Sequence, residues 1–230
     1  MGQEACRAID ADDDLELVAS VDIDDDLAVL VERACEVVVD FTVVDSARRT
    51  IAFLADQGIH AVVGTSGFDE SDHEAFRQAF TKSNCLLAPN FAIGAVLMTR
   101  FAEIAAPFFD TAEIIEFHHD TKIDAPSGTA THTAERMAAA SADWAPDPTT
   151  LEVFDGARGG EGPAGIRVHA VRMRGVVANQ EVLLGTTGQT LAIRHETVDR
   201  SSFMPGVVLA CKRIADFPGV TIGLDTYLGI

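Results

Sequence analysis

The chain has 230 residues, of which 47% are apolar and 23% charged, a composition typical of a globular protein with one large domain or two modest ones. Acidic residues outnumber basic ones, 36 Asp and Glu against 17 Lys and Arg, and the formal net charge is -19. A surface this negative repels phosphate backbones, which argues against a nucleic acid partner. The aspartate runs at 12–14 and 24–26, with lysine only at positions 82, 122 and 212, favour a salt-adapted protein over one with ordinary acidic loops.

No apolar run approaches the roughly 18 residues that cross a bilayer, and residues 1–14 lack the charged-then-apolar order of a secretory signal. The cysteines lie far apart and form no CxxC pair, which argues against a disulfide framework or a zinc site. We therefore expect a cytoplasmic protein without a membrane partner and with reduced, buried cysteines at Cys6, Cys35, Cys85 and Cys211.

The first part of the chain alternates between short β-rich runs and segments of helical length. Strands are predicted at 15–21, 37–41, 59–64 and 85–89, with helices at 45–57, capped by Asp45, and at 69–80. Such repeats indicate a parallel sheet, in which ligands bind at the carboxyl ends of the strands. Those ends carry Asp22, Asp40-Phe41-Thr42, Gly64-Thr65-Ser66-Gly67 and Pro89-Asn90-Phe91.

The pattern changes after residue 91. The remaining elements are predicted as a helix at 92–107, a strand at 113–119, a helix at 127–140, an irregular loop at 144–165, a bulged strand at 166–174, a hairpin of 181–185 with 190–194, a helix at 206–216 and a strand at 220–223. Adjacent strands without helices between them indicate a mixed or antiparallel sheet. The predicted fold is therefore α/β, with a Rossmann-like domain of residues 1–91 and 204–230 and an inserted α+β domain of residues 92–203.

The strongest local signal for chemistry is the segment from His118 to Ala130. His118, His119 and Lys122 precede a helix that opens through Ser127-Gly128-Thr129. The first turn of a helix attracts carboxylate or phosphate groups, and neighbouring His and Lys side chains can supply a proton near neutral pH. The alternative is a capped helix with two surface histidines. A metal site is disfavoured because adjacent strand residues point to opposite faces, so the two histidines cannot easily share an ion.

This segment closely resembles the signature of the 4-hydroxy-tetrahydrodipicolinate reductase (dihydrodipicolinate reductase) family. The matching residues are Glu116-Phe117-His118-His119, Lys122 to Ala130, Val39 to Thr42, Gly64 to Phe68, Ala88 to Phe91, Arg194-His195 and Arg200 to Phe203. They span most of the chain in the family's order. The resemblance implies a homotetrameric enzyme that uses NADH or NADPH to reduce a small cyclic dicarboxylate in diaminopimelate and lysine biosynthesis, with the second domain forming much of the tetramer.

The resemblance also implies roles for individual residues. His118 matches the family's acid/base histidine and Lys122 its proton-donating lysine, while His119, Gly128 and Thr129 match contacts to the substrate; Ser127 belongs to the same helix opening. The residues that match cofactor contacts are Asp22, expected to end a strand and bind ribose hydroxyls, then Gly64, Thr65 and Ser66, and finally Ala88, Pro89, Asn90 and Phe91. We expect a preference for NADH, because Asp22 is followed by Ile23 and by three aspartates that repel a ribose 2′-phosphate.

One departure from the family pattern concerns the start of the chain. The family begins with a strand and a glycine-rich phosphate loop ending in Met-Gly, whereas this sequence begins at Met1-Gly2 and continues with the helix that normally follows. Two explanations are open: an internal Met mistaken for the initiator, or a true truncation. The leading hypothesis is therefore the reductase, and the alternative is a truncated, non-catalytic dicarboxylate-binding or assembly subunit. A semialdehyde dehydrogenase would need a catalytic cysteine, and none lies near the His-Lys loop in sequence.

Overall fold

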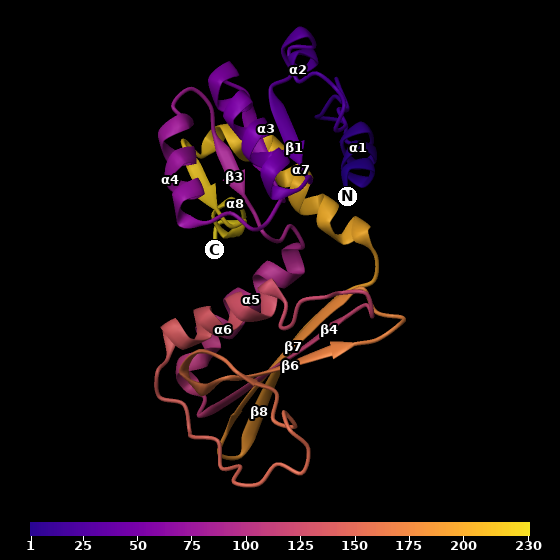
Figure 1. Ribbon diagram of the computed structural model, residues 1–230. Helices are drawn as coiled ribbons and strands as arrows, with labels where there is room; N and C mark the ends of the chain where they lie inside the picture. Colours follow the sequence, from indigo (N-terminus) through magenta and orange to yellow (C-terminus); the bar gives the residue numbers. More distant parts are fainter. The chain divides into compact units, whose positions relative to one another are not determined.

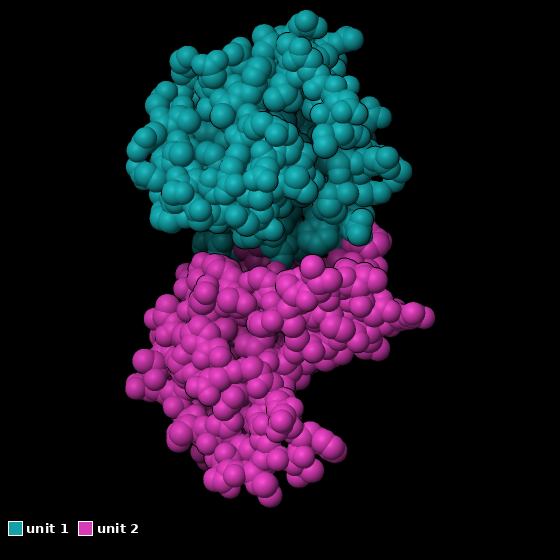
Figure 2. Space-filling view, in the orientation of Figure 1, with its two compact units in different colours: residues 1–93, 200–230 teal, residues 94–199 magenta.

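The computed structural model describes residues 1–230, which divide into two compact units. One unit comprises residues 1–93 and 200–230, and the other comprises residues 94–199 (Figure 2). No helix in either unit combines the length and the apolar character that crossing a membrane requires.

The first unit is built on a four-stranded parallel sheet (Figure 1). Its order is β1 (Val37–Asp40), β2 (His60–Val63), β3 (Cys85–Leu87) and β9 (Val220–Ile222). The helical segments of this unit are α1 (Gly2–Asp10), α2 (Ala28–Glu32), α3 (Val44–Gln57), α4 (Glu70–Ala79), η3 (Arg200–Phe203), α7 (Met204–Arg213), η4 (Ile214–Asp216) and α8 (Asp225–Leu228). Ala61, Val62 and Val63 of β2 are fully buried, which explains the continuous apolar run in the sequence.

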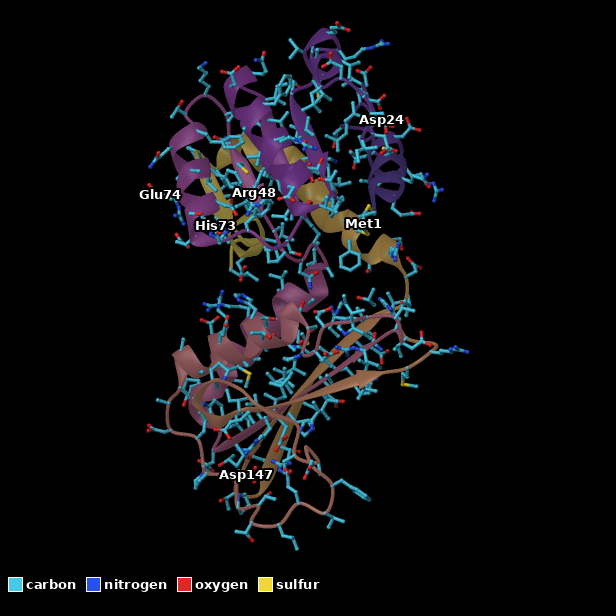
Figure 3. All side chains as sticks on the ribbon, viewed as in Figure 1. Met1, Asp24, Arg48, His73, Glu74 and Asp147 are labelled. Carbon is cyan, nitrogen blue, oxygen red and sulfur yellow. The ribbon has the colours of Figure 1, made fainter.

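Helix ends in this unit follow local chemistry. Gly58 ends α3 in the left-handed conformation, with φ of 70°. Asp69 caps α4 by accepting a hydrogen bond from the backbone of Asp72, whose carboxylate also binds Arg48 of α3 at 2.8 Å through two nitrogens. Figure 3 shows Arg48 and the neighbouring His73 on these two helices. The prediction that Asp45 caps α3 was wrong: Val43 is the capping residue and Asp45 lies inside the first turn.

The strand predicted at 15–21 is absent. Residues 15–21 adopt no regular structure, although Ala19 and Val21 pack against the core of the first unit. A strand needs a partner for its backbone groups, and here β1 pairs only with β2 and ends the sheet. The apolar character of the segment therefore produces burial without pairing.

The second unit contains a five-stranded mixed sheet (Figure 1). The strand order is β5 (Gly160–Glu161), β6 (Arg167–Arg172), β4 (Thr111–His118), β7 (Ala178–Thr186) and β8 (Gln189–Thr197), with only β4 and β6 parallel. Helices α5 (Ile93–Ala105) and α6 (Gly128–Ala140) accompany it, with short turns η1 (Ala106–Phe108) and η2 (Pro163–Gly165). Met98 of α5 and Met137 of α6 share a buried core with Ile114 of the sheet.

Two strand predictions in this unit had different outcomes. The hairpin is confirmed: β7 and β8 are joined by Thr187 and Gly188, and Gly188 adopts a φ of 81° that suits glycine. The bulge is wrong, because β6 pairs with β4 without interruption from Arg167 to Arg172. The shift in the apolar pattern instead marks the end of β6, since Met173 lies beyond the strand. The predicted α/β class with a second, mixed sheet is confirmed.

The cysteines are free, but they are not uniformly buried as predicted. Cys85 and Cys211 are buried, whereas Cys6 and Cys35 are partly exposed. Burial raises the pKa of the Cys85 and Cys211 thiols well above the ordinary range, so neither is a nucleophile near neutral pH.

Candidate active site

The centre of the site lies at the end of β4. Side chains alternate along this strand, so Ile114, Glu116 and His118 share one face. Ile114 is fully buried in the core. The Glu116 side chain is 0% exposed and that of His118 is 16% exposed. The carboxylate of Glu116 therefore lies deeper in the second unit than the imidazole of His118, the histidine that the sequence identified.

The buried carboxylate of Glu116 has three partners. Its Oε2 lies 2.6 Å from Nδ1 of His118, and both of its oxygens accept hydrogen bonds of 2.8 Å from Arg172. Oε1 also accepts a 3.1 Å hydrogen bond from the backbone N–H of Ser127. Burial alone would raise the pKa of Glu116, but the hydrogen bonds from His118 and Arg172 outweigh it and lower the pKa to about 2. Glu116 is thus an anion at neutral pH.

Lys122 lies on the loop between β4 and α6. Its Nζ is 2.7 and 2.8 Å from the two carboxylate oxygens of Asp124, and this ion pair lowers the pKa of Asp124. The Lys122 side chain is 20% exposed and that of Asp124 is 58% exposed, so the lysine has a solvent-accessible and replaceable partner. Arg172 crosses from β6 to bind the backbone carbonyl of Asp124 at 2.6 Å, which ties this loop to the sheet.

His119 points away from the buried partners of His118. It is exposed, and its Nδ1 lies 2.7 Å from the hydroxyl of Thr121. This divergence of the two histidines is what the strand geometry predicts.

The opening of α6 is fixed by buried polar groups. Ser127 is buried and caps the helix, its hydroxyl accepting a 3.2 Å hydrogen bond from the backbone of Ala130. A Cβ at Gly128 would meet no atom within 4 Å, so there is room for a ligand beside the first turn. Thr133 donates to the carbonyl of Thr129 at 2.8 Å and is itself held by Gln180 of β7 at 2.9 Å.

The residues expected to bind the cofactor lie in the first unit. Gly64, Thr65 and Ser66 follow β2, and the buried Asp40 at the end of β1 accepts a 2.9 Å hydrogen bond from the Thr65 hydroxyl. A Cβ at Gly64 would lie 2.1 Å from the Phe41 ring, so any other residue there would have to displace that ring. Ser66 is exposed at the carboxyl edge of the sheet, where ligands of parallel sheets bind.

Ala88, Pro89, Asn90 and Phe91 continue from β3. The backbone N–H of Ala88 donates to Val63 at 2.9 Å, and the Asn90 side chain accepts from Ala92 at 2.9 Å. The buried ring of Phe91 meets Phe41 edge-on, with centroids 5.7 Å apart. This segment is therefore a rigid continuation of the sheet.

The position of Asp22 differs from the expectation that it ends a strand. It is exposed in a turn, where its Oδ1 accepts from the backbone of Ile23 and its own N–H donates to Asp25. The reason is the same lack of a pairing partner for residues 15–21.

Glu116, Arg172 and Asp40 were not identified as site residues from the sequence. A charged residue on the apolar face of a strand, two positions before a candidate catalytic histidine, is a signal that points to Glu116. Arg172 is identifiable only from the register that places it opposite His118.

A Rossmann-like unit, together with a second unit that presents a histidine, a lysine and a helix N-terminus, is the combination that a nicotinamide-dependent oxidoreductase requires. Residues 1–91 match the family model described as "Dihydrodipicolinate reductase, N-terminus", and residues 94–228 match the C-terminal model of the same family. The chain belongs to the dihydrodipicolinate reductase family, as its sequence motifs indicated.

Individual relatives agree with this assignment. The 4-hydroxy-tetrahydrodipicolinate reductase of Nocardia farcinica is 52% identical over 237 residues, and that of Mycobacterium marinum is 50% identical over 234. Each alignment covers 100% of this chain and 95% of the relative. A dipicolinate-bound dihydrodipicolinate reductase from Paenisporosarcina sp. TG-14 has 34% identity and a TM-score of 0.86, covering 98% of this chain and 94% of that one. The prediction of an oxidoreductase is confirmed, and no comparison favours the non-catalytic alternative.

Proposed function

We propose that this chain reduces 4-hydroxy-tetrahydrodipicolinate with NAD(P)H. His118 and Lys122 protonate the species formed by hydride transfer and stabilise its developing charge. Membership of the family supports the reaction. The single observation that carries the residue roles is the link from His118 through the buried anion Glu116 to the N–H of Ser127 at the opening of α6. Lys122 lies on the loop between these two residues.

The second unit offers cationic and dipolar groups for a dicarboxylate. The first turn of α6, from Ser127 to Thr129, favours one carboxylate, and Lys122 provides a charge for the developing anion. The lysine can exchange Asp124 for substrate, because that ion pair is exposed. We expect His119 to be a further contact to the substrate. That the Paenisporosarcina relative binds dipicolinate, a cyclic dicarboxylate, supports this substrate class.

The residues of the first unit that follow β2 and β3 support binding of the nicotinamide end of a dinucleotide, as the family resemblance implies. The 4-hydroxyl group of the substrate leaves as water, which creates a ring double bond conjugated to C=N, and bound NAD(P)H would supply the hydride for a carbon of that conjugated system. Asp40 fixes Thr65 beside Gly64, which packs closely against the Phe41 ring, and Ala88 to Phe91 continue from the neighbouring strand. The exposed acidic turn after Asp22 supports a preference for NADH, since aspartates repel a ribose 2′-phosphate. Comparison of kcat/KM for NADH and NADPH tests this preference, and a clear advantage for NADPH refutes it.

The decisive experiment for the residue roles is turnover by the purified chain and by His118→Ala. NAD(P)H oxidation that depends on the substrate and falls by about 10²–10⁴-fold in the variant is expected for a general acid or base. Wild-type turnover by the variant would remove His118 from the mechanism. Binding of dipicolinate without any NAD(P)H oxidation by the wild-type chain would favour the non-catalytic alternative.

The assembly and location that the family resemblance implies are part of the same proposal. We expect a homotetramer, formed largely through the second unit, in the cytoplasm. Light scattering of the purified chain should give four times the 24.5 kDa of the monomer, and a monomer at assay concentrations would contradict it.

A further inference from the structure

Glu116 is fully buried beside the site, and it contacts His118 and the backbone of Ser127 from the interior of the second unit. It is 0% exposed and is surrounded by donors: His118, Arg172 and the backbone of Ser127. We infer that Glu116, charge-balanced by Arg172, is a positioning residue that locks His118 in one tautomer, so that Nε2 is the nitrogen that exchanges the catalytic proton. This inference rests on the proposed role of His118.

The tautomer follows from hydrogen-bond chemistry. An ionised carboxylate can only accept, and Arg172 donates to both oxygens of Glu116, which keeps it ionised. The ring nitrogen 2.6 Å from Glu116 must therefore carry a proton, so neutral His118 has its hydrogen on Nδ1. Nε2 then holds the lone pair and takes up or releases the proton, while the bond from Nδ1 to Glu116 remains intact.

The same carboxylate also sets the distance from His118 to the helix opening. Oε2 faces the imidazole, and Oε1 receives the N–H of Ser127, the residue that caps α6. Arg172 lies opposite His118 in the β4–β6 register and holds the carbonyl of Asp124. One buried ion pair thus fixes the histidine, the lysine loop and the carboxylate cradle in a common frame.

The same strand provides a matched control. Glu113 lies 2.6 Å from Nε2 of His169 and 2.5 Å from Arg158, so it also joins a histidine and an arginine. It lies on the opposite face of β4 from Glu116, and Arg158 links it to Asp147 of the irregular segment. Asp147 is labelled in Figure 3. Glu113→Gln therefore removes the same kind of charge from the same strand without touching His118 or α6.

The experiment compares Glu116→Gln with Glu113→Gln in the chain of 230 residues. A glutamine amide can accept from a protonated Nδ1 or donate to a bare one, so it does not require a proton on Nδ1. Long-range ¹H–¹⁵N spectra of histidine-labelled protein, at a pH where the imidazole is neutral, report the tautomer; the His118 signal is identified by its loss in His118→Ala. The wild type and Glu113→Gln should show the Nδ1–H form alone, and Glu116→Gln should show both forms.

Kinetics provide the second measurement. In Glu116→Gln, kcat should fall by about 10²-fold, at the lower end of the range for losing a general acid or base outright. KM for NADH should stay unchanged, because the proposed cofactor residues lie in the first unit. Glu113→Gln should keep the wild-type kcat. If Glu116→Gln alone does not fold, Glu116→Gln combined with Arg172→Gln removes the uncompensated arginine, and the same two measurements apply.

The inference is overturned if a folded Glu116 variant keeps the single Nδ1–H tautomer or the wild-type kcat, or if Glu113→Gln loses as much activity. Failure of the proposed function has a different outcome: His118→Ala would turn over normally, while the tautomer of His118 would still respond to Glu116.

Discussion

Replacing Lys122 with alanine tests the proposed chemistry with little disturbance of the fold. The Nζ of Lys122 binds only the exposed carboxylate of Asp124 among the contacts described above, and such an ion pair contributes about 0–1 kcal/mol to stability. The loss of a proton donor, by contrast, lowers kcat by about 10²–10⁴-fold, or roughly 3–5 kcal/mol of transition-state stabilisation. Substrate-dependent oxidation of NADH, followed by absorbance, measures this loss, and KM for NADH should not change.

The chain offers a matched control in Lys212, which pairs with Asp12 and Asp14 at 2.7 and 2.8 Å in the first unit. Lys212→Ala should retain the wild-type kcat. If Lys122 and His118 act on the same step, the double variant should lose less than the product of the single losses. Wild-type turnover in Lys122→Ala would refute the assignment, and equal losses in both lysine variants would mean that net charge, not the catalytic loop, is responsible.

Three further outcomes are expected. First, the pKa of Glu116 is about 2 against an ordinary 4.5, so the stability that its ionised form contributes is present above pH 4.5 and is lost as the pH falls through 2. The difference in unfolding free energy between wild type and Glu116→Gln should therefore narrow by about 2 kcal/mol from pH 6 to pH 3, and a difference that is flat with pH contradicts it. Second, Asp40→Ala should raise KM for NADH roughly five- to tenfold, because it removes the acceptor of the Thr65 hydroxyl. Asp40→Asn keeps an accepting oxygen and should leave KM unchanged. Equal effects of the two variants would exclude the hydrogen bond from Thr65 to Asp40 as the cause. Third, because the chain carries a net charge of -19, its melting temperature should rise from 0.1 to 2 M KCl, with the tetramer favoured at the upper end, and a flat or falling melting temperature contradicts salt adaptation.

Elements that are defined by local sequence were the predictable part of the fold. The buried runs of β1, β2 and β3 and the Ser127 cap of α6 depend on neighbouring residues, and each lies within a residue or two of its expected limits. The segment 15–21 has the same apolar character as these strands, but strand formation also requires a partner elsewhere in the chain. No property of the segment itself reveals whether that partner is adjacent.

The candidate site divides in the same way. His118, His119 and Lys122 stand together in the sequence, so their association needed no tertiary information. Arg172 is far along the chain, and only the pairing of β6 with β4 brings it opposite His118. Glu116, the partner of Arg172, lies two residues before His118 in the sequence. The burial of Glu116, however, depends on how α6 and the sheet enclose one face of β4.

The face of β4 also explains how rigidity and adaptability are distributed in this site. Ile114 is fully buried in the core of the second unit, and Glu116 and His118 follow it on the same face of the strand. Core packing around Ile114 therefore fixes the position of the His118 imidazole. Lys122 lies on a loop that is tied to this frame by Arg172, while its own charge pairs with the exposed Asp124. An exposed ion pair exchanges partners at small cost, whereas a buried one does not. The geometry therefore holds His118 fixed, and Lys122 can exchange Asp124 for a carboxylate of the proposed substrate.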